Sequence, residues 1–320
     1  GGILKSKRHV NLPGIRVNLP AITKKDREDI LLGIKEQVDF IALSFVREAD
    51  DIHELRKILG AKDGKIKVIA KIEDQQGVKN IDAIVDASDA IMVARGDLGV
   101  EINVAELPNV QRMIVKKCAE KGRRVIVATH LLESMIDNPI PTRAEVTDVA
   151  NAVYEEVDAV MLSGETTVGK HPVRCVEQLV EIADATESFQ GLNFASDLSS
   201  EKDKQQIARA AVTLAENIGA VGIIVITRRG KMADFVTNCH PNKTRIYAFT
   251  NDSQTRRRLV LNRNLSPFRS AFSKDPEKTL QTAFEVLLDR AGLKKADKVV
   301  VISDALAGTG IEAIQIRQLP

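Results

Sequence analysis

A repeating unit constrains this chain of 320 residues more than any other feature of its sequence. Short apolar runs alternate with amphipathic stretches of helical length between residues 38 and 187. The expected strands are 38–45, 66–71, 90–93, 125–128 and 159–162, and the expected helices lie near 48–59, 76–87, 108–121, 143–157 and 172–187. This alternation predicts a parallel sheet covered by helices.

Polar side chains gather directly after the expected strands: Ser44 and Arg47, Lys71 and Glu73, Arg95 and Asp97, Thr129 and His130, and Ser163 and Glu165. In a (β/α)₈ barrel this end of the sheet forms the active site. The sequence offers five such units, and five parallel strands make an open sheet or most of a barrel, not a closed one.

The densest of these groups follows the strand 66–71. Residues two apart in an extended chain point to the same side, so Lys71 and Glu73 share one face. If the next strand is adjacent, Asp97 converges with Glu73 at the same edge. Two carboxylates suit Mg²⁺, and a neighbouring lysine would stabilise negative charge on a phosphoryl or enolate oxygen. A salt-bridged strand end without a metal is the alternative interpretation.

The two ends of this region are less regular. Residues 1–22 carry two Asn-Leu-Pro triplets and read as hinge-like chain, after which Thr23 and Asp26 predict a helix start with Ile30, Leu31 and Ile34 facing inward. Residues 189–204, rich in Ser, Asp and Lys, read as a linker. A smaller three-layer α/β domain is expected over 205–320, with strands at 221–226, 245–249, 298–302 and near 313–316 and helices at 205–218, 231–239, 253–263 and 276–292.

Composition excludes several classes of protein. The net charge is +2 from dispersed charges, and there is no Trp and only two Tyr, so nucleic acid is not an expected partner. No apolar run approaches the roughly 20 residues of a membrane span, and no signal peptide is visible. Three distant cysteines form no disulfide or metal pattern, so a cytoplasmic location is the expectation.

An ordered set of motifs gives the chain a family resemblance. The set is VNLPG (10–14), SFVR (44–47), KIE (71–73), MVARGDLG (92–99), ATHLLESM (128–135), PTRAEVTDVANAV (141–153), MLSGET (161–166), ITRRGKMADFV (226–236), TNDSQTRRR (250–258) and GTG (308–310). Each motif alone is weak, but the order is specific, and the chain resembles pyruvate kinases along nearly its whole length.

This resemblance implies a glycolytic enzyme that transfers the phosphoryl group of phosphoenolpyruvate to ADP, giving pyruvate and ATP. It implies that Glu73 and Asp97 hold Mg²⁺ or Mn²⁺ and that Lys71 neutralises the phosphoryl and enolate oxygens. It places the Gly96 and Asp97 amides at the substrate carboxylate and Thr129 near the enolate carbon, in a proton-delivery chain that ends in water. Ser44 would lie near the phosphoryl group and a K⁺ ion.

The resemblance also implies the organisation of the chain. Residues 1–14 would be the tail of a lid domain and a hinge, with Lys7 and Arg8 near the nucleotide. Residues 15–188 would form part of the (β/α)₈ barrel, and 205–320 a regulatory and oligomerisation domain of a homotetramer. The chain opens on Gly-Gly-Ile without a Met, which suggests a piece of something longer. The first three barrel strands and most of the lid would precede residue 1, together with the phosphoryl-side arginine and most K⁺ ligands, so the isolated chain is expected to be inactive or impaired.

One residue and one loop differ from what many members of the family carry. His130 stands where relatives often carry Gln, and packing beside the site is favoured over a direct proton role. In the second domain, Thr227, Arg228, Arg229, Gly230 and Lys231 would form a phosphate loop for a sugar-phosphate or nucleotide effector, with GTG (308–310) beside it. Relatives often carry Ser and Thr in that loop, and a solvated charged loop is the alternative.

Three functions remain open from the sequence. The first is the phosphotransferase. The second is a non-catalytic module that senses a phosphorylated metabolite or assembles subunits. The third is a lyase or aldolase that binds pyruvate enolate through Mg²⁺, which would not explain the second domain or the PTRAE stretch (141–145).

Overall fold

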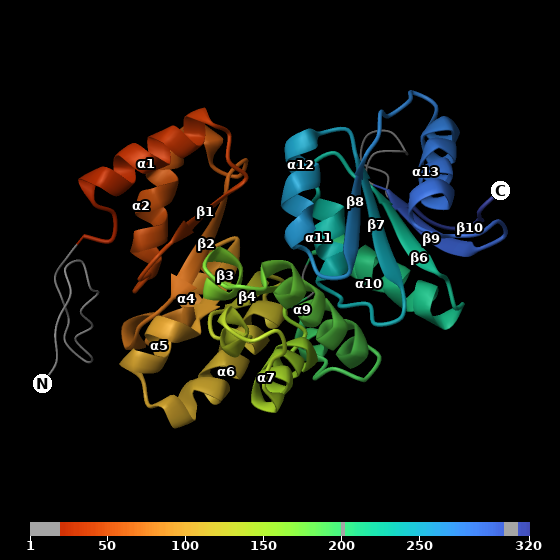
Figure 1. Cartoon of the computed structure of the whole chain (residues 1–320). Coiled ribbons are helices and arrows are strands. Elements are labelled where there is room, and N and C mark those ends of the chain that lie inside the picture. Colours follow the sequence, from red (N-terminus) through yellow and green to blue (C-terminus); the bar gives the residue numbers. More distant parts are fainter. Residues whose placement is uncertain (1–19, 200–201, 304–312) are drawn as a thin grey trace, which may run out of the picture. The chain divides into compact units, whose positions relative to one another are not determined.

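The structure, a computed structural model, describes residues 20–199, 202–303 and 313–320 (Figure 1). Lys7, Arg8 and the GTG motif at 308–310 lie outside these residues, so their expected roles stay predictions. The chain divides into two compact units. The first comprises Gly1–Val115, Ile126–Asp148 and Met161–Leu179, and the second comprises Lys116–Val125, Val149–Val160 and Val180–Pro320.

The first sheet confirms the parallel arrangement that the repeating unit predicts. Its strands are β1 (Phe40–Leu43), β2 (Lys67–Ile72), β3 (Ala90–Ala94), β4 (Arg124–Ala128) and β5 (Ala159–Met161), and they follow one another in sequence order across the sheet. Parallel pairing joins β1 to β2 and β2 to β3. Every residue of β3 and β4 is buried, as expected for strands covered on both faces.

Helices follow each of these strands. They are α2 (Ala49–Leu59), α3 (Gln75–Lys79), α4 (Ile81–Ala87), α5 (Arg95–Glu101), α6 (Leu107–Glu120), α7 (Arg143–Tyr154), α8 (Gly164–Thr167) and α9 (Pro172–Glu187), with α1 (Lys24–Lys35) ahead of β1. The capping box of Thr23 and Asp26 starts α1 as predicted. Of the predicted inward residues Ile30 is buried, but Leu31 is 54 % exposed, so that part of the prediction is wrong.

One glycine fixes how the segment after β1 packs on the segment after β2. A Cβ built on Gly77 in α3 would lie 2.6 Å from the carbonyl oxygen of Val46, so a larger residue cannot fit without a backbone shift. Gly77 N in turn donates to Asp74 Oδ1, which caps α3. The close approach of Gly77 to Val46 therefore lets the residues after β1 and β2 pack together at the carboxyl-terminal edge of the sheet.

The second sheet belongs to the second unit and has the order β10-β9-β6-β7-β8. Its strands are β6 (Gly222–Ile226), β7 (Arg245–Thr250), β8 (Leu265–Arg269), β9 (Lys298–Ser303) and β10 (Ala313–Gln318). All neighbours are parallel except β10, which runs antiparallel to β9. The chain therefore starts in the middle of the sheet, moves to one edge and returns to the other, which is the doubly wound order that was predicted.

Helices cover both faces of this second sheet (Figure 1). On one face α10 (Asp203–Asn217) and α11 (Lys231–Thr237) pack on β6, β7 and β9, and on the other face α13 (Pro276–Arg290) does so. A further helix, α12 (Ser253–Arg258), precedes β8. In the described residues no helix is both long and apolar enough to cross a membrane.

Candidate functional site

Lys71 and Glu73 meet at the carboxyl-terminal end of β2. Lys71 Nζ lies 2.7 Å from Glu73 Oε1 and donates to Ser44 Oγ at 2.9 Å. The two-residue period of a strand therefore correctly predicts that Lys71 and Glu73 lie on the same face. The parallel pairing of β1 with β2 adds Ser44 to the group, since Ser44 directly follows β1.

The Glu73 carboxylate is held from two sides. Glu73 as a whole residue is 1 % exposed, and its second carboxylate oxygen, Oε2, accepts a hydrogen bond from Phe45 N at 2.6 Å. Phe45 has a left-handed backbone (φ 52°), which is unfavourable for a bulky side chain and points its amide at this carboxylate. An ionised carboxylate offers about four lone-pair sites, so Glu73 keeps acceptor capacity for a cation.

Asp97 lies in the first turn of α5, directly after β3. The register of β2 on β3, with Ile72 opposite Val93, brings Glu73 and the start of α5 to the same edge of the sheet. Within the residues that the structure describes, the Asp97 side chain makes no hydrogen bond or ion pair, and no three His, Cys, Asp or Glu side chains gather as a metal centre. Two carboxylates suit Mg²⁺, which keeps several waters and takes substrate oxygens.

Thr129 follows β4, the neighbour of β3, and contacts the start of α5. Its Oγ1 accepts a hydrogen bond from Gly96 N at 2.7 Å and donates to Ala128 O at 2.6 Å. The residues that the family resemblance assigns to the substrate carboxylate and to the enolate carbon are therefore neighbours. The predicted site residues of the first sheet lie at or just after the carboxyl-terminal ends of four successive strands, β1 to β4. They are Ser44, Lys71, Glu73, Gly96, Asp97 and Thr129.

Arg95 joins this group, although no role was predicted for it. Its guanidinium is buried (7 % exposed) and donates to the carbonyl oxygen of Thr129 from Nε at 3.3 Å and from Nη2 at 2.7 Å. Arg95 Nη1 lies 2.7 Å from Asp148 Oδ1 in α7 and 3.5 Å from Gln111 Oε1 in α6. A charged residue directly after five buried residues was the signal available in the sequence, because a charge there must find partners.

Glu165 is a second residue to which the sequence assigned no role. It is 2 % exposed and accepts hydrogen bonds from Leu132 N at 3.1 Å and from Ser163 N at 2.7 Å. Because Leu132 follows β4 and Ser163 follows β5, the carboxylate joins the two segments. Glu165 therefore fixes the path of the chain just beyond Thr129.

His130 lies just outside β4, with an exposed side chain whose Nε2 is 3.6 Å from Glu133 Oε2. A Cβ built on Gly96 would lie 3.5 Å from His130 Cε1 and 3.5 Å from Thr129 Oγ1. His130 thus borders the site, and its expected packing role stays a prediction.

The expected phosphate loop follows β6. Thr227 is buried, and its Oγ1 accepts a hydrogen bond from Gly230 N at 3.2 Å. Gly230 has a left-handed backbone (φ 81°) and precedes α11, while Arg228, Arg229 and Lys231 are exposed. The loop therefore presents three cationic side chains to solvent, and whether they bind an effector stays a prediction.

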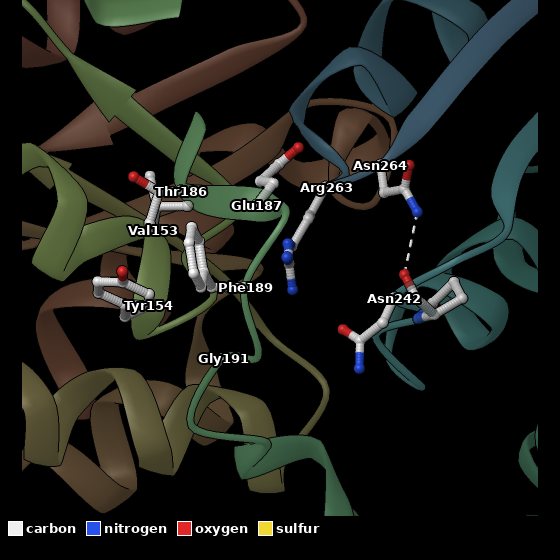
Figure 2. A pocket seen from close by; sticks show the side chains of 10 residues that line it. Val153, Tyr154, Thr186, Glu187, Phe189, Gly191, Asn242, Arg263 and Asn264 are labelled. Atoms are coloured by element: carbon white, nitrogen blue, oxygen red, sulfur yellow. Dashed lines mark hydrogen bonds between the residues drawn. The ribbon is translucent and has the colours of Figure 1, made fainter. Parts of the chain in front are cut away.

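The second unit also holds a small pocket of about 50 Å³ that contains none of the expected site residues (Figure 2). Its lining residues are Val153, Tyr154, Thr186, Glu187, Phe189, Gly191, Pro241, Asn242, Arg263 and Asn264. Beside it, Glu156 (1 % exposed) lies 3.5 Å from Arg263 Nη1 and 3.6 Å from His240 Nδ1. Burial alone would raise the pKa of Glu156, but His240 and Arg263 outweigh it and lower the pKa.

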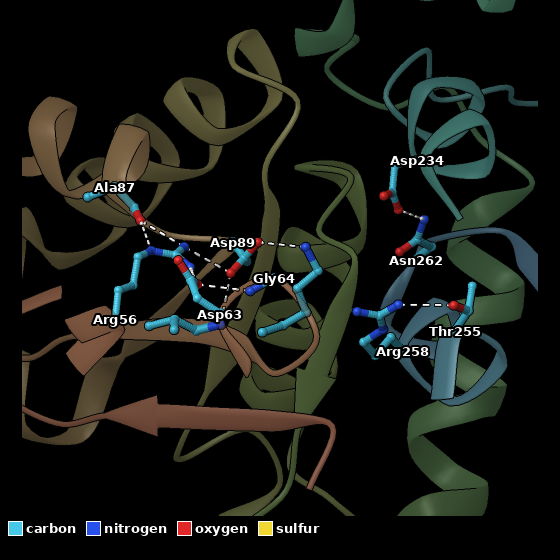
Figure 3. A network of polar contacts seen from close by, with 11 residues as sticks. Arg56, Asp63, Gly64, Ala87, Asp89, Asp234, Thr255, Arg258 and Asn262 are labelled. Atoms are coloured by element: carbon cyan, nitrogen blue, oxygen red, sulfur yellow. Dashed lines mark hydrogen bonds and ion pairs between the residues drawn. The ribbon is translucent and has the colours of Figure 1, made fainter. Parts of the chain in front are cut away.

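At the opposite end of the first sheet a polar network binds the amino-terminal ends of β2 and β3 (Figure 3). Asp89 lies 2.8 Å from Lys67 Nζ and 2.9 Å from Arg56 Nη2, and it accepts a hydrogen bond from Val68 N. Arg56 also contacts Asp63. In barrel-type sheets this end serves stability rather than chemistry.

The fold and the site define a class: an α/β protein in which a parallel sheet carries paired carboxylates and a lysine at its carboxyl-terminal edge, followed by a doubly wound domain. The family comparisons narrow the class. Residues 1–176 match the barrel domain of pyruvate kinase, and residues 205–313 match its alpha/beta domain. The chain belongs to the pyruvate kinase family.

Curated relatives agree with this assignment. The chain is 44% identical over 310 residues to a pyruvate kinase of Geobacillus stearothermophilus, and the matched region covers 95% of this chain and 52% of the relative. It is 42% identical over 304 residues to pyruvate kinase isozyme G, chloroplastic, of Ricinus communis (94% of this chain, 72% of the relative). It is 41% identical over 325 residues to a pyruvate kinase of Dictyostelium discoideum (99% of this chain, 64% of the relative). The chain therefore spans between about half and three quarters of the length of these relatives.

Proposed function

We propose that this chain supplies the metal-binding and enolate-side part of a pyruvate kinase active site, in which the phosphoryl group of phosphoenolpyruvate passes to ADP to give pyruvate and ATP. The observation that carries the proposal is the contact of Lys71 Nζ with Glu73 Oε1 at 2.7 Å, at the edge of the sheet where α5 also begins. Family membership supports the same reaction, because relatives over nearly the whole chain are named pyruvate kinases.

We assign Glu73 and Asp97 to a divalent ion, Mg²⁺ or Mn²⁺. When bound, such an ion supplies charge neutralisation for the phosphoryl and enolate oxygens. The donor set fits it, since two carboxylates leave room for water and substrate. A K⁺ ion near Ser44 is part of the proposal.

Lys71 has the charge and position to neutralise the same oxygens. Its ammonium has three hydrogens, of which two point at Glu73 and Ser44, so one remains for an incoming oxygen. Phosphoryl transfer depends mainly on positioning and charge neutralisation, which this arrangement supplies. Catalytic gain requires that the interaction strengthen as charge develops, and a preorganised ammonium meets that requirement.

The Asp97 amide, together with the Gly96 amide once it releases Thr129 Oγ1, would bind the substrate carboxylate, and Thr129 would lie near the enolate carbon. Thr129 Oγ1 accepts a hydrogen bond from Gly96 N and donates its proton to Ala128 O, so the hydroxyl must turn away from Ala128 O to reach the carbon. We propose that the turned hydroxyl gives its proton to the enolate carbon and regains one from water, which is general acid catalysis by a positioned hydroxyl.

Several assignments reach beyond the first sheet. We propose that Lys7 and Arg8 meet the nucleotide and that Thr227, Arg228, Arg229, Gly230 and Lys231 bind the phosphate of a sugar-phosphate or nucleotide effector. A homotetramer and a cytoplasmic location complete the proposal, although three of the relatives are named chloroplastic. For the domain limits we keep 1–14, 15–188, 189–204 and 205–320.

The test is pyruvate formation in a coupled assay. The 320 residues are expected to turn over phosphoenolpyruvate poorly or not at all, and a fusion to the part of the Geobacillus stearothermophilus relative that this chain does not match should restore activity. The same fusion with Lys71→Met serves as the inactive control. A fusion that binds phosphoenolpyruvate and Mn²⁺ but forms no pyruvate would instead favour the non-catalytic binding module.

A further inference from the structure

We infer that Arg95 is a positioning residue that holds Thr129 in the conformation from which its hydroxyl meets the Gly96 amide. The inference deepens the proposed function, on which the role of Thr129 rests. Arg95 directly follows β3 and Thr129 directly follows β4, and these strands are neighbours in the sheet. The two residues therefore come from different β/α units.

Thr129 adopts a backbone conformation that its side chain disfavours. Its φ is 72°, in the left-handed region, where a β-branched residue is rare. The next residue, His130, is also left-handed (φ 54°). Such conformations cost about 1–3 kcal/mol each and persist only where the surroundings enforce them. Something must therefore hold this segment in place.

Arg95 provides that restraint. Its Nε and Nη2 both donate to the Thr129 carbonyl, at 3.3 and 2.7 Å, and this fixes the direction of the peptide after Thr129. Asp148 Oδ1 fixes the other side of the guanidinium, 2.7 Å from Nη1. The planar fork is essential, because a lysine ammonium cannot span the carbonyl and the carboxylate with the same geometry.

The conformation decides where the hydroxyl points. With the carbonyl held by Arg95, Thr129 Oγ1 lies 2.7 Å from Gly96 N. If the carbonyl were released, Thr129 could relax to a negative φ, which would carry Oγ1 away from Gly96. Arg95 therefore acts on the site through Thr129 and not by contact with the substrate.

The chain contains a matched control in Arg124. It is equally buried (7 % exposed) and forms an ion pair with Asp158 at 2.8 Å, but it begins β4, whereas Thr129 follows the strand's other end. The first measurement is hydrogen exchange of the Gly96 amide, by NMR, in the 320-residue chain. Arg95→Lys should speed that exchange about tenfold or more, since the hydrogen bond to Thr129 loses its support. Arg124→Lys should lower the melting temperature and leave Gly96 exchange unchanged.

Gly96 exchange that is unchanged by Arg95→Lys, or equally accelerated by Arg124→Lys, would overturn the inference. The second measurement is a double-mutant cycle in the active fusion. Arg95→Lys alone should lower kcat about tenfold, whereas in a Thr129→Val background it should change kcat by less than about twofold, because coupled residues are not additive. Effects that multiply would show that Arg95 does not act through Thr129. A fusion that forms no pyruvate rejects the proposed function, while the exchange result still decides the role of Arg95.

Discussion

Lys71 and Glu73 form a close ion pair in which the carboxylate is buried and the ammonium is partly open to solvent. The side chain of Glu73 is 2 % exposed and that of Lys71 is 25 % exposed. A buried carboxylate with an accessible cation is suited to receive an anionic substrate, because the cation can turn toward it without exposing the carboxylate.

Replacing Lys71 should therefore affect the reaction more than the metal. In the active fusion, Lys71→Met should lower kcat by roughly 10²–10³ while changing Mg²⁺ affinity much less, because the ammonium matters most as charge develops. Lys67→Met is the matched control, since Lys67 lies on the same strand but pairs with Asp89 at the other end. A Lys71→Met variant within twofold of the parent would remove this lysine from the mechanism.

The pH dependence of stability should report on Asp89. Burial alone would raise its pKa, but Lys67, Val68 N and Arg56 outweigh it and lower the pKa in the folded state. Its pairs therefore stabilise the fold above the unfolded-state pKa of about 3.9, and the contribution is lost as the pH falls through the lower folded-state value. Asp89→Asn should cost about 3 kcal/mol near neutral pH, as breaking a buried pair does.

Thermal melts of parent and variant across this pH range check the prediction. The difference between them should shrink in acid, and the exposed Asp184→Asn should stay within about 0.5 kcal/mol of the parent throughout. A difference that grows as the pH falls would contradict the assigned sign.

The cysteines should be unreactive in the folded protein. Cys118 and Cys175 are fully buried and all three cysteines are free. Burial raises the pKa of the Cys239 thiol to about 11, so little thiolate forms near neutral pH. A thiol reagent should modify all three only after unfolding in guanidinium chloride. Rapid modification of the native chain would show that one of these sites opens.

Much of the fold follows from hydrophobic patterning, and the exceptions have physical causes. The strand β8 was not predicted from the sequence because it contains Pro267, which removes a backbone donor and argues against a strand. It lies at the edge of the sheet, where proline is tolerated. The expected helix 76–87 is two helices, α3 and α4, that meet at Asn80. The Asn80 side chain donates a hydrogen bond to the Arg47 carbonyl oxygen at this break.

Of the contacts at the site, some could likewise be predicted from the sequence and others could not. The side-by-side placement of Lys71 and Glu73 could be predicted because it depends only on the two-residue period of a strand. The contact of Arg95 with Thr129 could not, because it depends on the neighbouring strand and on a left-handed backbone at a threonine. Sequence patterns favour glycine at such positions, so an enforced exception leaves no local signal.

The claim that Glu73 and Asp97 form a metal site is central, and Mn²⁺ binding to the 320-residue chain tests it most directly, because both carboxylates lie in this chain. Mn²⁺ titration followed by water proton relaxation should show binding to the parent and at least about tenfold weaker binding to the double variant Glu73→Gln, Asp97→Asn. The variant Glu28→Gln, Asp29→Asn, which makes the same charge change on exposed residues of α1, should bind as the parent does. Unchanged Mn²⁺ affinity in the Glu73→Gln, Asp97→Asn variant, together with a lower melting temperature without metal, would mean that the two carboxylates only stabilise the strand ends.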